Sequence, residues 1–182
     1  MISIIAAMSK NRVIGDKGEV PWHITEDYLS FNKLTKKHPV IMGRKTHESI
    51  SVFKKQEGWD KDNKIVKHKL LPKRTNIIIT SQKNYSVDGG IVVHSLEAAI
   101  HIAKESVGSE EIFIIGGGDI YKDSLDFADK IYLTEIEADV QGDTFFPEID
   151  LSQWKLVSYK KRIVRVLNCK IVYNFEVFSK VS

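Results

Sequence analysis

The stretch Glu111-Ile112-Phe113-Ile114-Ile115-Gly116-Gly117-Gly118-Asp119-Ile120-Tyr121 joins an apolar run to three consecutive glycines and then to the start of a helical pattern. The apolar run predicts a buried strand, and the glycines predict a turn at which only backbone can face a ligand. The stretch nearly matches the dinucleotide-binding fingerprint, but Tyr121 takes the place of the last glycine and the motif comes late in the chain. An ordinary Rossmann domain is therefore disfavoured, and a tight turn before a packed helix is the alternative interpretation.

Three further apolar runs end in turn or cap residues in the same way, and each predicts a buried strand. These runs cover residues 2–8, 39–42 and 76–79. Helical patterns lie at 25–35, at 46 to about 53, at 95–106 and from about Asp119, with Thr25, Thr46 and Ser95 as the expected N-caps. Strands that alternate with helices predict an α/β fold in three layers, with helices on both faces of a mostly parallel central sheet.

The last third of the chain has a different pattern. Apolar and polar residues alternate at 131–136, 154–159 and 170–178, and no helical pattern separates the last two segments. We therefore expect a C-terminal antiparallel hairpin that closes one edge of the sheet.

A stretch rich in Lys, Asp, Glu and Gln runs from about residue 53 to residue 70. We expect a charged, exposed insertion there, either a solvated loop or a short amphipathic helix, because most charge runs are surface features. The length of 182 residues suits one compact domain and is short for two, so we expect residues 1–182 to form a single domain.

The composition is that of an ordinary soluble protein, with 42% hydrophobic and 28% charged residues. The single cysteine, Cys169, excludes an intramolecular disulfide and a zinc site built on cysteines, which favours a reducing, cytoplasmic location. The apolar start at 1–8 is too short for a signal or membrane segment. A net charge of +3 is too small to indicate nucleic-acid binding. The six histidines form no HxxxH or HxH pair, so we expect no metal site.

Ligands of open α/β sheets bind at the carboxyl ends of the strands, so the residues after each predicted strand are the first candidates for a site. Gly43-Arg44-Lys45-Thr46 follows the run at 39–42 and offers a glycine, two cations and a helix cap to a phosphate. Thr80-Ser81-Gln82 follows the run at 76–79 and supplies short donors suited to a second phosphate or a ribose. Two anion sites on neighbouring strands suggest a dinucleotide.

Asp27 follows Pro21-Trp22 and falls in the first turn of the helix predicted at 25–35, on the same face as Phe31. A carboxylate in a first turn can simply stabilise the helix dipole, and this alternative applies equally to Glu26. Asp27 differs from Glu26 because it aligns with the aromatic ring, and an apolar wall disfavours the charged form of a carboxylate. The chain has no nucleophile elbow, Walker motif or Ser-His-Asp order, which leaves proton and hydride chemistry.

Taken together, a set of short motifs strongly resembles the bacterial dihydrofolate reductases in order and spacing over nearly the whole chain. The motifs are Ala6-Ala7, Val13-Ile14-Gly15, Pro21-Trp22, Asp27, Phe31, Val40-Ile41-Met42-Gly43-Arg44-Lys45-Thr46, Ser49-Ile50, Ile115-Gly116-Gly117-Gly118-Asp119-Ile120-Tyr121, Thr134 and Gly142-Asp143-Thr144-Phe145-Phe146-Pro147. The resemblance implies the fold of that family and the NADPH-dependent reduction of 7,8-dihydrofolate to 5,6,7,8-tetrahydrofolate, which supports one-carbon metabolism and nucleotide synthesis.

The resemblance further implies a folate pocket in which Asp27 accepts hydrogen bonds from the pterin and Thr134 joins the same network. Trp22 would hold an ordered water near the pterin, and this water would protonate N5 while Asp27 orients and polarises the ring. Arg74 would bind the glutamate α-carboxylate, a group that suits a bidentate guanidinium. The other substrate contacts implied are the backbone carbonyl of Ile5 and the side chains of Tyr28, Phe31, Ile50 and Ile115.

For the cofactor NADPH, the resemblance implies a mobile lid at residues 14–20 and a cis peptide between Gly116 and Gly117. Arg44, Ser81 and Gln82 would recognise the 2′-phosphate. The cofactor contacts implied are Ala7, Ile14, Gly15 and Val20 at the nicotinamide and lid, Gly43, Arg44, Lys45, Thr46, Thr80, Ser81 and Gln82 at the phosphates, and Gly116, Gly117, Gly118, Asp119, Ile120 and Tyr121 at the glycine turn. Two positions depart from the family pattern: Tyr28 replaces a usually aliphatic residue, and Asp119 stands where several bacterial members have a cation.

The family pattern also implies a monomer that binds dihydrofolate and antifolate-type small molecules and requires neither nucleic acid nor a membrane. One alternative is a related reductase of another pteridine or of a pyrimidine, as in riboflavin synthesis, although Pro21-Trp22 with Asp27 and Phe31 favours folate. Another is a non-catalytic nucleotide-binding module that docks RNA or a protein through its basic insertion, which the modest net charge disfavours.

Overall fold

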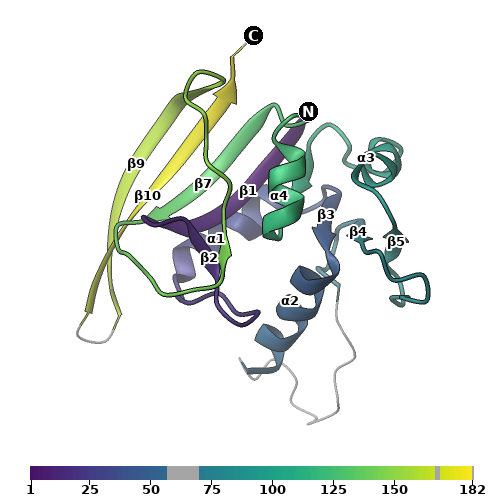
Figure 1. The fold of residues 1–182 in the computed structure, drawn as a ribbon, viewed down its shortest axis with the longest axis horizontal. Helices are drawn as coiled ribbons and strands as arrows, with labels where there is room; N and C mark the ends of the chain where they lie inside the picture. Colours follow the sequence, from purple (N-terminus) through teal and green to yellow (C-terminus); the bar gives the residue numbers. More distant parts are fainter. Residues whose placement is uncertain (57–69, 167–168, 182) are drawn as a thin grey trace.

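The computed structural model describes residues 1–56, 70–166 and 169–181 of the chain. Within these residues, a central sheet has the spatial order β5 (Ile91–Val93), β4 (Asn76–Ile79), β3 (Val40–Gly43), β6 (Ile112–Ile114), β1 (Ile2–Ser9), β7 (Lys130–Ile136), β10 (Cys169–Lys180) and β9 (Trp154–Val166). The strands from β5 to β7 run parallel to their neighbours, whereas β10 is antiparallel to both β7 and β9. The mostly parallel sheet and the C-terminal antiparallel hairpin are therefore confirmed (Figure 1).

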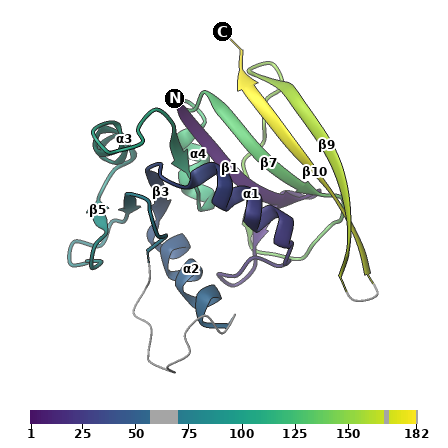
Figure 2. The ribbon, with the colours of Figure 1, turned by 180° about the vertical axis from the view of Figure 1, so that it is seen from behind.

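Helices cover both faces of this sheet, as the alternating patterns predict. On one face, α1 (Thr25–Thr35) and the start of α2 (Arg44–Gln56) bring Phe31 and Ile50 against an apolar cluster that contains Phe113. On the other face, α3 (Leu96–Lys104) and α4 (Gly118–Ser124) bury Ala99 and Tyr121 in a second cluster. Figure 1 shows α4 in front of the sheet, and Figure 2, which is turned by 180°, shows α1 on the opposite side.

The strands missing from the predictions are the shortest ones. They are β5 and the small antiparallel pair of β2 (Val13–Gly15) and β8 (Thr144–Phe145), each only two or three residues long. Segments of this length show no periodicity, and β2 forms because Val13 pairs with Phe145, far away in the chain. The hairpin strands are also longer than predicted, because Lys160, Lys161 and Arg162 interrupt the alternation that marks the start of β9.

Of the three expected helix caps, Ser95 is confirmed and two are wrong. The Ser95 hydroxyl accepts a hydrogen bond from the Ala98 backbone N–H at 3.1 Å. The N-cap of α1 is Ile24, whose extended backbone enters the helix without a side-chain cap, so Thr25 is already helical. Thr46 is the third residue of α2, which begins directly after β3 at Arg44. Sequence patterns locate helix ends to within one or two residues, and both errors have that size.

The charged insertion predicted at about 53–70 lies largely outside the described residues, which omit 57–69. α2 continues to Gln56, past its expected end near residue 53. In the part of the chain that the structure describes, no helix is both long enough and apolar enough to span a membrane.

Candidate active site

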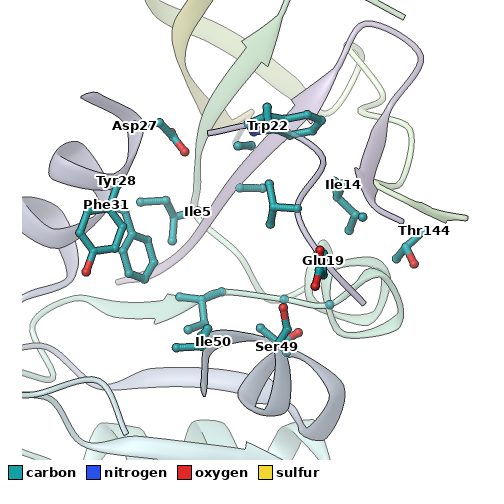
Figure 3. Close-up of a pocket in the computed structure, with 18 of the residues that line it drawn as sticks. Ile5, Ile14, Glu19, Trp22, Asp27, Tyr28, Phe31, Ser49, Ile50 and Thr144 are labelled. Atoms are coloured by element: carbon teal, nitrogen blue, oxygen red, sulfur yellow. The ribbon is translucent and has the colours of Figure 1, made fainter. Parts of the chain in front are cut away.

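A cavity of about 330 Å³ opens beyond the carboxyl ends of β1 and β6, the edge at which parallel α/β sheets bind their ligands. α1 and α2 form two of its walls, and the segment between β2 and α1 closes over it (Figure 3). Predicted site residues that line the cavity are Ile5, Ala7, Ile14, Gly15, Val20, Trp22, Asp27, Tyr28, Phe31, Lys45, Thr46, Ile50, Ile115, Gly116, Gly117 and Tyr121.

Asp27 lies in the first turn of α1 with its side chain directed into the cavity. The hydroxyl of Thr134, on β7, donates a hydrogen bond to Asp27 Oδ1 at 2.5 Å, and Thr134 itself is buried. Burial raises the pKa of the Asp27 carboxyl, and the Thr134 hydrogen bond opposes part of that rise. The site therefore holds a carboxylate that gains from a ligand able to donate hydrogen bonds or carry positive charge.

The wall around Asp27 is mostly apolar. Figure 3 shows Tyr28, Phe31 and Ile5 on one side of the opening, with Ile50 on another. Trp22 lies above them, and its indole Nε1 is buried without an acceptor among the described residues. A buried N–H gains from an acceptor of its own. Together these surfaces suit a planar heterocycle with polar groups along its edge.

Tyr121 connects the glycine turn to β1. Its hydroxyl donates a hydrogen bond to the backbone carbonyl of Ile5 at 2.8 Å. Burial, together with the negative charge of Asp27, raises the pKa of the Tyr121 phenol, so this donor stays protonated. The Tyr121 hydroxyl thus fixes the direction of the Ile5 carbonyl, which is expected to face the substrate. The carbonyl oxygen keeps a second lone pair that can accept a hydrogen bond from the substrate.

The turn after β6 brings backbone close to the cavity, as its glycines predict. The peptide between Gly116 and Gly117 is cis, which confirms the expectation from the resemblance. Gly116 has φ +110, and a Cβ atom there would stand 3.0 Å from the Tyr121 ring. A Cβ atom at Gly117 would stand 3.2 Å from the Thr46 hydroxyl oxygen. The turn therefore leaves a narrow cradle, open to a ligand, between α2 and α4.

The segment predicted as a lid, residues 14–20, contains the end of β2 and a tight turn at 16–19. Asp16 and Glu19 exchange two backbone hydrogen bonds of 2.9 and 3.0 Å, and Lys17 and Gly18 between them both have positive φ. Asp143 holds the turn from outside, because its carboxylate accepts from the Lys17 backbone N–H at 3.0 Å. The Asp143 N–H in turn donates to the Gly15 carbonyl at 3.1 Å. These contacts fix the turn beside the cavity, which Gly15, Gly18 and Glu19 help to line.

Arg74 lies outside the cavity wall, next to one of its lining residues. Its guanidinium carbon is 5.8 Å from the centre of the Phe31 ring. Two residues of α1 hold it in place, since Nε donates to the Thr35 hydroxyl at 3.0 Å and Nη2 donates to the Asn32 side-chain oxygen at 2.9 Å. Partial burial lowers the pKa of the guanidinium, which still carries its charge at any physiological pH. Arg74 is thus a fixed cation at the outer end of the cavity.

The remaining predicted cofactor contacts lie beyond the cavity wall. Gly43 and Ile79 are paired in the parallel ladder, so the segments that follow β3 and β4 leave the same edge of the sheet. Arg44 forms an ion pair with Glu48, with Nη1 2.8 Å from the carboxylate, one turn along α2. The predicted residues at this outer edge and at the start of α4 are Gly43, Arg44, Thr80, Ser81, Gln82, Gly118, Asp119 and Ile120.

Several cavity residues are absent from the sequence-based set. Ser49 follows Thr46 by three residues and shares its helix face, so helical spacing could have identified it. Glu19 lies within the predicted lid, but nothing in the sequence directs its side chain inwards. The full set of additional lining residues is Ala6, Gly18, Glu19, His23, Ile24, Ser49, Leu71 and Thr144.

Comparisons with known proteins agree on one family. The family model described as "Dihydrofolate reductase" matches residues 1–57 and 63–180. A dihydrofolate reductase of Bacillus subtilis (strain 168) is 42% identical over 87% of this chain and 82% of its own. One from Buchnera aphidicola subsp. Baizongia pistaciae is 39% identical over 100% and 99% of the two chains.

The likeness extends to three dimensions. The solved structure of dihydrofolate reductase from Enterococcus faecalis, complexed with NADP(H) and RAB-propyl, matches with a TM-score of 0.83 at 30% sequence identity. The match covers 100% of this chain and 97% of that one. With a family match over nearly its whole length, and with Asp27 and Thr134 joined at the base of an apolar cavity, the chain belongs to the dihydrofolate reductase family.

Proposed function

We propose that the chain reduces 7,8-dihydrofolate to 5,6,7,8-tetrahydrofolate with NADPH, and so supplies reduced folate for one-carbon metabolism and nucleotide synthesis. The observation that carries this proposal is the buried Asp27–Thr134 pair inside a cavity that reaches the Gly116–Gly117 turn. A folate ring and a nicotinamide need such a combination: a carboxylate for the pterin edge and exposed backbone for the cofactor.

The residues around the glycine turn fit NADPH. Because Gly117 has no side chain, the space beside it that a methyl group would fill stays open. A flat ring or a phosphate can therefore approach the backbone closely there. Lys45 and Thr46 line the cavity from the first turn of α2, where backbone N–H groups and the helix dipole favour an anion. Arg44, Ser81 and Gln82 would bind the 2′-phosphate farther out. When bound, NADPH supplies the hydride that C6 of the substrate accepts.

Asp27 would bind the pterin by accepting hydrogen bonds from its amino group and ring N–H. The charge on Asp27 polarises the ring, and its raised pKa makes such donors more favourable partners than they would be in water. Thr134 fixes the carboxylate, and the buried Trp22 Nε1 would hold the water that protonates N5. Phe31 and Ile50 would enclose the aminobenzoyl ring, which directs the glutamate tail towards Arg74.

One assay tests the proposal directly. Purified protein is mixed with NADPH and dihydrofolate, and the absorbance of the reduced nicotinamide is followed over time. We expect its loss to depend on both reactants and to produce tetrahydrofolate in equal amount. A protein that binds NADPH but turns over only another pteridine or a pyrimidine would point to the related reductases instead, and a protein that turns over neither would contradict the proposal.

We expect Arg74→Leu to raise the Michaelis constant for dihydrofolate by about 10- to 100-fold, the loss that follows when a charged hydrogen-bonding partner is removed. The turnover number should change little, because Arg74 lies at the far end of the cavity from Asp27. Steady-state kinetics with dihydrofolate, and with a dihydropterin that lacks the glutamate tail, measure both effects.

The matched control is Lys73→Leu, which removes the neighbouring cation without touching the contacts to Asn32 and Thr35. It should leave the Michaelis constant for dihydrofolate unchanged. An equal loss with the tail-free substrate would show that Arg74 acts on the shape of the pocket and does not bind the glutamate.

The domain number, oligomeric state and cellular location of the enzyme also follow the family pattern in our proposal. We infer a single domain that acts as a monomer in the cytoplasm and that also binds antifolate-type small molecules. The strand order of the described residues supports the single domain, since β1 lies between β6 and β7 and thus joins early and late segments in one layer. Sedimentation of the purified protein at micromolar concentration should give the mass of one chain.

A further inference from the structure

Two carboxylates line the cavity among the residues that the structure describes, and the proposed mechanism uses one of them. Asp27 comes from α1, whereas Glu19 comes from the lid. Figure 3 shows Glu19 away from Asp27, on the side of Ile14 and Thr144, across the cavity from the wall that Tyr28 and Phe31 form. Glu19 is exposed at the rim, so its carboxylate stays solvated and can act on a charged group that enters the cavity.

Backbone hydrogen bonds fix the position of the Glu19 main chain. Its N–H and C=O both pair with Asp16, and the left-handed residues Lys17 and Gly18 complete a two-residue turn of the kind that fits a tight hairpin. Asp143 anchors the same turn through the Lys17 N–H. The Glu19 side chain therefore starts from a defined point at the rim of the cavity.

The end of the cavity that Glu19 faces is the end assigned to the nicotinamide, so this inference rests on the proposed function. Ile14, which the family resemblance places at the nicotinamide, lies on the same side of the cavity as Glu19 (Figure 3). The reduced nicotinamide ring is neutral, whereas the ring left after its hydride has gone to substrate C6 carries one positive charge. A nearby carboxylate stabilises the second form and leaves the first almost unaffected.

We propose that Glu19 is a specificity residue of the lid that recognises the charge of the oxidised nicotinamide. It strengthens the binding of NADP⁺ relative to NADPH, and so makes the bound cofactor a better hydride donor. In this scheme the negative charge of Asp27 acts on the substrate, and the negative charge of Glu19 acts on the cofactor.

The test is equilibrium binding of NADP⁺ and of NADPH, separately, to the wild-type enzyme and to Glu19→Gln, which keeps the size of the side chain and removes its charge. We expect the variant to bind NADP⁺ about fivefold more weakly, with NADPH affinity unchanged. The difference should shrink as salt is raised, because Glu19 is exposed at the rim. Glu97→Gln, which removes an exposed carboxylate on α3, is the control and should bind both forms like the wild type.

The outcomes separate this proposal from the proposed function. Equal weakening of both cofactor forms would show that Glu19 serves the structure of the lid, and no change in either would show that its charge does not reach the ring. Both results overturn the role of Glu19 while leaving the reductase intact. Failure of the wild-type protein to bind either form would instead overturn the proposed function.

Discussion

Replacing Asp27 with Asn is expected to lower dihydrofolate turnover at neutral pH by about 100-fold or more, the range lost when a positioned acid–base group is removed. Asn keeps the size of the side chain and an oxygen to accept from Thr134, but it loses the charge that polarises the pterin. Activity should recover in part as the solution is made more acidic, because the substrate then arrives already protonated. Steady-state rates from about pH 5 to about pH 8 measure the effect.

The same substitution should make the ligand-free protein more stable at neutral pH. Burial raises the folded pKa of Asp27 above its unfolded value, so the folded state holds this proton over a wider range of pH. The contribution of Asp27 to stability is therefore full below its unfolded pKa and declines as pH rises through the folded pKa. The amide of the Asp27→Asn variant does not titrate, so this decline should be missing from its thermal unfolding curves recorded over the same range of pH.

Glu26→Gln is the matched control for Asp27→Asn. Glu26 is the preceding residue in the same helical turn, but its side chain is exposed and does not line the cavity. It should keep full activity and show no gain in stability of the kind expected for Asp27→Asn. NADPH titration should give wild-type affinity for both variants. Unchanged neutral-pH activity in Asp27→Asn would mean that another residue binds the pterin.

The second large effect is expected at the glycine turn, where Gly116→Ala should lower the free energy of unfolding by about 2–3 kcal/mol and abolish NADPH binding. The φ of +110 suits glycine, and the new methyl group would stand 3.0 Å from the Tyr121 ring. Tyr121 cannot easily move, because its hydroxyl is bound to the Ile5 carbonyl. Thermal unfolding and fluorescence titration with NADPH measure the two losses.

Two further variants separate the effect of backbone strain on stability from the effect of lost space on NADPH binding. Gly89→Ala has a similar backbone problem, φ +74, but meets Leu70 at an ordinary 3.5 Å and lies outside the cavity. It should cost about 1 kcal/mol of stability and leave NADPH binding intact. Gly117→Ala, with φ −85, should stay folded yet weaken NADPH by filling the cradle beside Thr46. Tight NADPH binding by Gly117→Ala would show that the cofactor does not enter that cradle.

Much of the fold could be predicted because its signals are local. The runs that became β1, β3, β4 and β6 are continuous and apolar, and the Ser95 cap sits where its side chain bonds a residue three positions away. The glycine turn was also predictable, since a strand, three glycines and a helix start leave backbone exposed whatever surrounds them. By contrast, β2 and β8 have no pattern of their own and depend on pairing with each other.

Local patterns in the amino-acid sequence were enough to predict the layers of the fold, the turn at Gly116–Gly117 and the position of Asp27 in the first turn of α1. The chemistry of these parts depends on contacts between residues far apart in the chain. Thr134 lies 107 residues from the carboxylate that it holds, and Tyr121 lies 116 residues from the carbonyl that it orients. Likewise, Glu19 lines the rim of the cavity from a turn that the distant Asp143 anchors. Periodicity reports which residues face the core, but charge, burial and orientation depend on neighbours that only the folded chain brings together.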